Sequence, residues 1–226
     1  MRHALSRAGW LRVLPFALFM LLLAVRGYVP ADGSWGFDAR WIYGLKALLV
    51  AGMLWIWRGE YGELSRQNLP TAREALTAVA VGLAVFALWI QLDAPWMTIS
   101  TASAPFAPVD AAGRLDWGLV TVRILGAALV VPPMEELFWR SFVMRWIESE
   151  RFESVLPAQV GLKAIVLSTF LFMLAHTLWL AAVIAGLAYA LLYVRSGKLW
   201  LPVIAHSVTN GALGVWVVAT GNWQFW

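Results

Sequence analysis

The sequence contains no cysteine among its 226 residues. A chain without cysteine has no disulfide framework, no thiolate nucleophile and no cysteine-ligated metal. Any group that activates a substrate or a water must therefore come from other side chains.

Charged side chains are also scarce, at 13% of the residues, against roughly 25% in an ordinary soluble domain. Hydrophobic residues make up 61%, and so few charges could not cover a soluble domain of this size. We therefore expect lipid to be the solvent for most of the chain. At about 20 residues per span, the chain has room for about eight transmembrane helices and for no separate soluble domain. The prediction is an all-α, polytopic integral membrane protein with a single domain over residues 1–226.

Apolar runs locate the expected spans in two groups. Three N-terminal spans lie within residues 10–92, at Trp10 to Val29, Trp41 to Trp57 and Ala75 to Leu92. The remaining spans form a core over about residues 117–220.

Two features of this core predict where its helices break or turn. A helix begins at Trp117 and should break at Pro132-Pro133, because proline has no backbone donor. The run from Val160 to Val194 is about 35 residues, too long for one span, so we expect it to turn near His176.

Basic residues flank the apolar runs. Arg12 and Arg26 flank the first run and should snorkel to the headgroups. Lys46 and Arg123 could either line a cavity or snorkel, and we favour snorkelling or pairing between helices. The basic start also fits a signal peptide with a loose cleavage site at Val29-Pro30-Ala31, but further spans downstream favour retention of this helix.

The net charge of +4 does not indicate nucleic-acid binding, because the basic residues form no stripe. They gather at the N-terminus, between Arg58 and Arg73, and at Arg195 to Lys198. Since basic loops stay on the cytoplasmic side, we expect a cytoplasmic N-terminus. The 15 tryptophans read as interfacial belts.

A carboxylate pair lies where the helix is expected to break. Glu136 and Arg140 are four residues apart and can pair on one helix face, while Glu135 points elsewhere and stays free to take a proton. The alternative is an amphipathic helix with solvated charges at the interface.

Two histidines interrupt apolar runs. His176 follows Phe172 by one turn, and His206 precedes Asn210 by one turn. A lone buried histidine is more often a packed residue than a catalyst. Together with the glutamates, however, these residues can activate a water, and Glu135, His176 and His206 are also a recognised zinc set.

The three ordered motifs resemble the CAAX prenyl protease and bacteriocin-processing family of intramembrane proteases. The motifs are Glu135-Glu136-x-x-x-Arg140, Phe172-x-x-x-His176 and His206-x-x-x-Asn210. Asp38-Ala-Arg-Trp41 further resembles the subgroup associated with exosortase sorting systems.

The resemblance implies an eight-helix fold whose cavity opens to the cytoplasmic side. Glu135 and His176 would activate water there, and His206 and Asn210 would hold the oxyanion. Glu136, Arg140 and Phe172 would support the site. The implied enzyme needs no cofactor, with zinc as the lesser alternative.

The expected function is hydrolysis of a peptide bond in a membrane-associated protein or peptide. The resemblance places the enzyme in the bacterial inner membrane with an exosortase-type sorting system as partner. Two alternatives stay open, namely a non-catalytic immunity or scaffold protein of the same fold and a small proton-coupled transporter.

Overall fold

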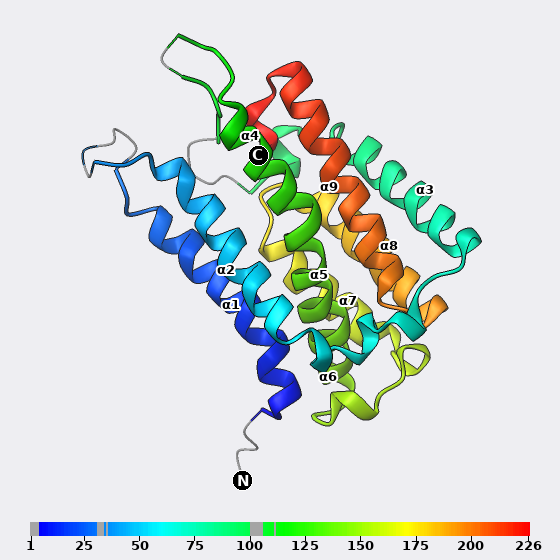
Figure 1. The fold of residues 1–226 in the computed structure, drawn as a ribbon. Helices are drawn as coiled ribbons and strands as arrows, with labels where there is room; N and C mark the ends of the chain where they lie inside the picture. The colour runs from blue at the N-terminus through cyan, green and yellow to red at the C-terminus, as the bar shows by residue number, and fades with distance from the viewer. Residues whose placement is uncertain (1–4, 31–33, 35, 100–105, 111) are drawn as a thin grey trace.

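The computed structural model describes residues 5–30, 34, 36–99, 106–110 and 112–226, and within these residues the fold is all-α (Figure 1). The helices are α1 (Arg7–Arg26), α2 (Ile42–Ile56), α3 (Ala72–Trp89), α4 (Trp117–Leu125), α5 (Val131–Glu136), α6 (Arg145–Glu148), α7 (Leu162–Leu174), α8 (Trp179–Ser196) and α9 (Trp200–Thr220). An isolated bridge between Val109 and Leu115 is the one β-type pairing in the described part of the chain.

Six of the described helical stretches are long and apolar enough to cross a membrane, so the chain is a multi-pass membrane protein. The predicted number of about eight spans is too high for this part of the chain, because α4 to α6 form one stretch from Trp117 to Glu148 and α7 has only 13 residues. An average span length would divide the residues of this long stretch between two helices, whereas they form one.

Local sequence signals stabilise the helix ends. Ser6 accepts a hydrogen bond from the Gly9 amide at the start of α1, and Thr71 forms a capping box with Glu74 at the start of α3. Gly197 ends α8 with φ of 70°, a left-handed conformation that glycine adopts without strain. The turn between α7 and α8 falls at residues 175–178, as predicted near His176.

The predicted break at Pro132-Pro133 does not occur. The helix continues through the prolines because π-helical turns at Gly126–Val130 and Leu137–Met144 flank α5. In the first of these turns the Val131 amide donates to the Gly126 carbonyl, five residues back. A wider turn accommodates the missing donors without ending the helix, and such turns are frequent at functional sites.

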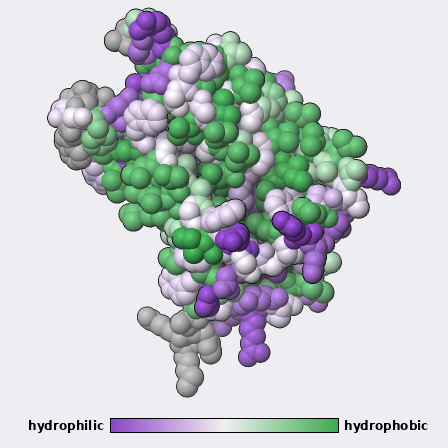
Figure 2. All heavy atoms as spheres, in the orientation of Figure 1, coloured by the Kyte–Doolittle hydropathy of each residue, from purple (hydrophilic) through white to green (hydrophobic). Residues whose placement is uncertain are grey.

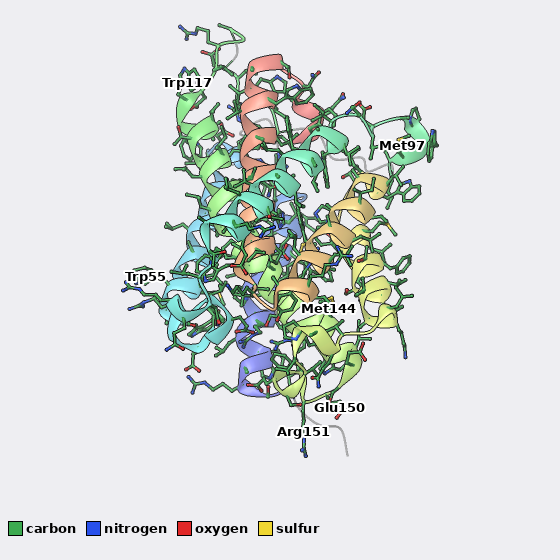
Figure 3. All side chains as sticks on the ribbon, turned by 90° about the vertical axis from the view of Figure 1, so that its right-hand side faces the viewer. Trp55, Met97, Trp117, Met144, Glu150 and Arg151 are labelled. Atoms are coloured by element: carbon green, nitrogen blue, oxygen red, sulfur yellow. The ribbon has the colours of Figure 1, made fainter. Side chains whose placement is uncertain are left out.

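The helices run between two ends of the bundle. The start of α1 and the α2–α3, α6–α7 and α8–α9 connections share one end, which we call the basic end, and the C-terminus lies at the opposite end (Figure 1). In Figure 3, Met97 and Trp117 mark the opposite end, whereas Glu150 and Arg151 mark the basic end. Hydrophobic surface covers much of the body between them (Figure 2).

Arg12 does not snorkel to the headgroups. It is buried, and it binds Glu63 through an Nη2–Oε2 contact of 2.6 Å. Arg145 binds the other oxygen of Glu63 at 2.9 Å, and the Ser141 hydroxyl donates to that same oxygen. We call these residues the Glu63 cluster, and they join α1, the α2–α3 connection and the Trp117–Glu148 helix near the basic end.

The first helix packs as part of the fold. Leu11 and Phe19 of α1 are buried in the helix core, and Phe16 stacks on Phe138 with ring centroids 4.0 Å apart. The cleavage site considered at Val29-Pro30-Ala31 includes Ala31, which lies outside the described residues.

Candidate active site

Glu136 is at the centre of a buried ion-pair group. Its side chain is 0% exposed, its Oε1 lies 2.9 Å from His206 Nδ1, and its Oε2 lies 3.1 Å from Arg140 Nε. The predicted pairing of Glu136 with Arg140 on one helix face is confirmed, and the alternative of solvated interfacial charges is wrong for this pair. The site thus connects the long helix to α9.

Arg140 is held by more than its carboxylate partner. Its guanidinium lies 4.6 Å from the centre of the Phe172 ring, and its Nη2 donates to the Gly186 carbonyl at 3.3 Å. A side chain at position 186 would begin 2.9 Å from Thr169 Cγ2 and 3.3 Å from the Phe172 ring, so the absence of one lets α8 approach α7 closely. Phe172 therefore supports the site by packing on the cation.

His206 has its two ring nitrogens in different environments. Because Glu136 as a carboxylate only accepts hydrogen bonds, Nδ1 of His206 carries the hydrogen that joins them. The ring stacks on Tyr189 with centroids 5.0 Å apart, and the Tyr189 hydroxyl donates to Thr209. These contacts fix the ring plane and leave Nε2 with no protein partner among the described residues.

His176 is held in the same manner at a different place. Its Nδ1 lies 2.7 Å from the Phe172 carbonyl, which can only accept, so Nδ1 donates and neutral Nε2 keeps a free lone pair. Its ring also contacts the Phe172 and Trp89 rings. A histidine with this tautomer can accept a proton from water.

Glu135 points into a cavity rather than into the ion-pair group. It is 8% exposed, and its Oε2 is buried without a hydrogen-bond partner among the residues that the structure describes. The cavity has a volume of about 270 Å³. Its lining includes Glu135, Phe172, His176, His206 and Asn210. Glu136 and Arg140 are not part of that lining and lie in the wall behind it.

The sequence left one difficulty, namely how His176 could reach Glu135 if α7 crossed the membrane outward. A helix of 13 residues is only about 20 Å long, shorter than a hydrocarbon core of about 30 Å. Glu135 lies well inside the 32-residue stretch from Trp117 to Glu148. Both residues therefore line one cavity within the bundle.

Asn210 has a contact that the sequence did not predict. Its Nδ2 donates to the Ala127 carbonyl at 2.9 Å. In an α-helix that carbonyl would bind the Val131 amide, but Val131 bonds to Gly126, and residue 132 is a proline without an amide hydrogen. Asn210 thus satisfies a carbonyl that the π-turn and the proline leave free, and its second Nδ2 hydrogen remains for the cavity.

The zinc alternative can be compared with the geometry. Among the residues that the structure describes, no group of three His, Cys, Asp or Glu side chains is close enough to hold a metal ion. Glu135, His176 and His206 share a cavity but do not form such a group.

Sequence reasoning missed two contributors to this cavity and favoured other positions for two more. Tyr189 and Thr209 lie in apolar helices, and nothing in their spacing distinguishes them from packing residues. Lys46 and Arg123 were expected to snorkel or pair between helices, yet both line the cavity and neither forms an ion pair in the described structure. Their position among apolar residues was the available signal.

The cavity extends toward the end opposite the basic end. Beyond the residues named above it is lined by Leu23 near the end of α1, by Lys46 near the start of α2, by Arg123 of α4 and by the C-terminal Trp226. The resemblance implies a cavity open to the cytoplasm, whereas the basic loops imply a cytoplasmic basic end. These two expectations conflict in this fold.

Comparison with known proteins agrees with the motif pattern. Residues 117–212 match the family model described as Rce1-like, type II CAAX prenyl endopeptidase Rce1-like. This segment contains all three motifs and is less than half of the 226-residue chain. No curated protein and no solved structure matches the chain.

Residues 117–212 are therefore similar to the Rce1-like type II CAAX prenyl endopeptidases, and that similarity suggests a peptidase.

Proposed function

We propose that the protein is an intramembrane glutamate-type endopeptidase that hydrolyses a peptide bond of a membrane-associated protein or peptide. The observation that supports this most is the pair of unpartnered proton acceptors in one cavity, Glu135 Oε2 and His176 Nε2. Buried polar atoms without partners are rare, and at a functional site they await a substrate or a water.

In the proposed mechanism, Glu135 takes a proton from a water that His176 Nε2 also binds. The resulting hydroxide attacks the carbonyl carbon of the scissile bond, and the carbonyl oxygen becomes an oxyanion. Protonated Glu135 then donates its proton to the leaving nitrogen as the C–N bond breaks. A positioned general base contributes about 10²- to 10⁴-fold to the rate of such a step.

Donors for the oxyanion come from α9. His206 can donate through Nε2 only as the imidazolium, because Nδ1 already carries the hydrogen shared with Glu136. The buried Glu136 carboxylate stabilises that protonated form, which gives the second glutamate a role distinct from Glu135. The free Nδ2 hydrogen of Asn210 is the second proposed donor, and each such donor is worth roughly 3 kcal/mol in other hydrolases.

We further propose a location in the bacterial inner membrane with a cytoplasmic N-terminus, supported by the basic residues at the α2–α3 connection and the α8–α9 turn. An exosortase-type sorting system is the proposed partner, and Asp38-Ala-Arg-Trp41 supports it.

The test compares membrane-associated peptides from cells with the wild-type protein and cells with Glu135→Gln, using mass spectrometry of protein N- and C-termini. Uncleaved precursors should accumulate in the variant cells only. The control is Glu150→Gln, an exposed carboxylate near the basic end. Identical profiles with normal levels of the variant protein would contradict a peptidase and favour the immunity or scaffold alternative.

A further inference from the structure

Lys46 is a buried cation with no anionic partner in the described part of the chain. Its side chain lies near the start of α2, it is 5% exposed, and its Nζ lies 4.0 Å from the Phe19 ring centre and 5.0 Å from the Tyr43 ring centre. It forms no hydrogen bond and no ion pair with any other described residue. A buried ammonium in an apolar run is costly unless it faces water or an anion.

Arg123 lies beside it on the same cavity. Its guanidinium lies 4.2 Å from the Tyr43 ring centre, 5.2 Å from Phe106 and 5.9 Å from Trp226, and its Nε is buried without a partner. Aromatic rings engage the charge without using the N–H groups that a carboxylate would bind. Apart from an interaction with the nearby Tyr43 hydroxyl, the described residues leave the donors of Arg123 available to a ligand.

Arg40, at the same end of the bundle, shows what a neutralised cation looks like. It binds Asp38 at 2.7 Å and donates to the carbonyls of Ala107 and Val109. A second cavity, of about 180 Å³, is lined by Arg26 and Arg40 and also by Lys46 and Arg123. Lys46 and Arg123 therefore line both cavities. Among the described residues, no carboxylate contacts the charged group of either side chain.

We propose that Lys46 and Arg123 form a subsite for a carboxylate group of the peptide substrate. Both line the cavity that contains Glu135 and His176, so the anion and the scissile bond would occupy one continuous space. The peptide nature of the ligand depends on the proposed function, but the anion preference depends on the two cations alone.

The subsite also sets a length. Arg123 and Glu135 are 12 residues apart on one helix, which corresponds to about 18 Å along its axis. An extended peptide covers that distance with about five residues, and fewer are needed because both side chains reach inward. The carboxylate should therefore lie within a few residues of the cleaved bond, as a C-terminus or as an acidic side chain.

Binding can be measured apart from cleavage on the Glu135→Gln protein in phosphatidylcholine nanodiscs. The probe is a fluorescein-labelled apolar hexapeptide made with a C-terminal carboxylate, with a C-terminal amide, and as an amide with one internal glutamate. We expect at least one carboxylate form to bind about tenfold or more tightly than the plain amide. Which form gains affinity distinguishes a terminal from a side-chain carboxylate.

The substitutions Lys46→Gln and Arg123→Gln together should bring the affinity ratio of carboxylate to amide down to about 1. Arg123→Lys keeps the charge and should keep most of the preference, which separates charge from folding. The matched control is Arg114→Gln, an exposed arginine outside the cavity, which should leave the ratio unchanged.

Equal affinity for carboxylate and amide probes in the parent protein would overturn the subsite. A preference that survives both substitutions would also overturn it. So would a preference that disappears when anionic lipid is added, because the two cations would then bind a lipid headgroup. Cleavage of peptides without a carboxylate preference would refute the subsite and leave the peptidase intact. A carboxylate preference with no cleavage of any peptide would support the subsite and contradict the peptidase.

Discussion

Two buried charged clusters lie along the same helix, and they differ in how completely their polar atoms are bonded. In the Glu63 cluster both carboxylate oxygens accept hydrogen bonds, from Arg12, Arg145 and Ser141. In the cluster around Glu135 and Glu136, by contrast, Glu135 Oε2 and Arg140 Nη1 are buried and have no hydrogen-bond partner within the described ranges.

The difference separates a structural role from a chemical one. A fully bonded ionic network in a low dielectric holds helices in register, whereas a partly bonded one costs stability unless a ligand completes it. Burial would raise the pKa of Glu63, but the hydrogen bonds and charge of Arg12 outweigh burial and hold that pKa below its ordinary value. The Glu63 cluster is therefore fully bonded within the fold, whereas under the proposed function the unbonded atoms around Glu135 are those that bind water and substrate.

The largest expected effect is on catalysis. Glu135→Gln removes the proposed base and should lower peptide hydrolysis by about 10³-fold, within the range for a positioned general base. The measurement is the rate of cleavage of an identified precursor by purified protein in nanodiscs. A variant that retains more than a tenth of the wild-type rate would show that Glu135 is not the base.

The next effect is on stability at the other cluster. Glu63→Gln leaves Arg12 and Arg145 as buried cations without a counter-charge and should destabilise the fold by about 3–5 kcal/mol. Denaturant titration in detergent measures this. Glu60→Gln is the control, because Glu60 forms an exposed ion pair with Arg7 that should contribute less than about 1 kcal/mol. Equal losses of stability in the two variants would mean that burying the network does not increase its contribution to the free energy of unfolding.

A smaller effect is expected at Asn210. Replacing it with alanine leaves the Ala127 carbonyl without its donor and should cost about 1–3 kcal/mol of stability, together with a loss of activity. Thermal unfolding and cleavage rate are to be measured on the same sample. Asn222→Ala is the control, since Asn222 is exposed and its side chain donates to the Thr220 hydroxyl at the surface. Full stability with lost activity would assign Asn210 to the oxyanion alone.

The smallest effect is the acid dependence of stability. Because the folded-state pKa of Glu63 is lowered, its contribution is fully present above the unfolded pKa of about 4.3 and is lost as the pH falls through the lower folded value. The thermal unfolding midpoint of the wild type should therefore fall more steeply below about pH 4 than the midpoint of Glu63→Gln. Parallel curves for the two proteins would indicate that Glu63 has the same pKa folded and unfolded.

Much of the fold follows from hydropathy and local signals. The apolar runs place most of the helices, and the turn near His176 is where length alone predicts it. The number of spans was wrong because no sequence rule shows that π-turns carry a helix through Pro132-Pro133. The π-turn is supported by the side chain of Asn210, which is 83 residues from the carbonyl that it satisfies.

The candidate site was predictable for a different reason. Glu135, Glu136, Arg140, His176 and His206 are ionisable residues at positions where lipid makes them costly, so their mere presence indicates function. The partners that orient them are ordinary residues such as Tyr189, Thr209 and the Phe172 carbonyl. Backbone and neutral partners leave no pattern in the sequence, and only the folded chain brings them into contact.

The most direct test of the central claim is the thermal unfolding midpoint of Glu135→Gln and Glu63→Gln, measured side by side in the same nanodiscs. If the Glu135 cluster serves chemistry and the Glu63 cluster serves the fold, Glu135→Gln should unfold at or above the wild-type midpoint and Glu63→Gln several degrees below it. A loss at Glu135 as large as the loss at Glu63 would contradict the division of roles between the two clusters.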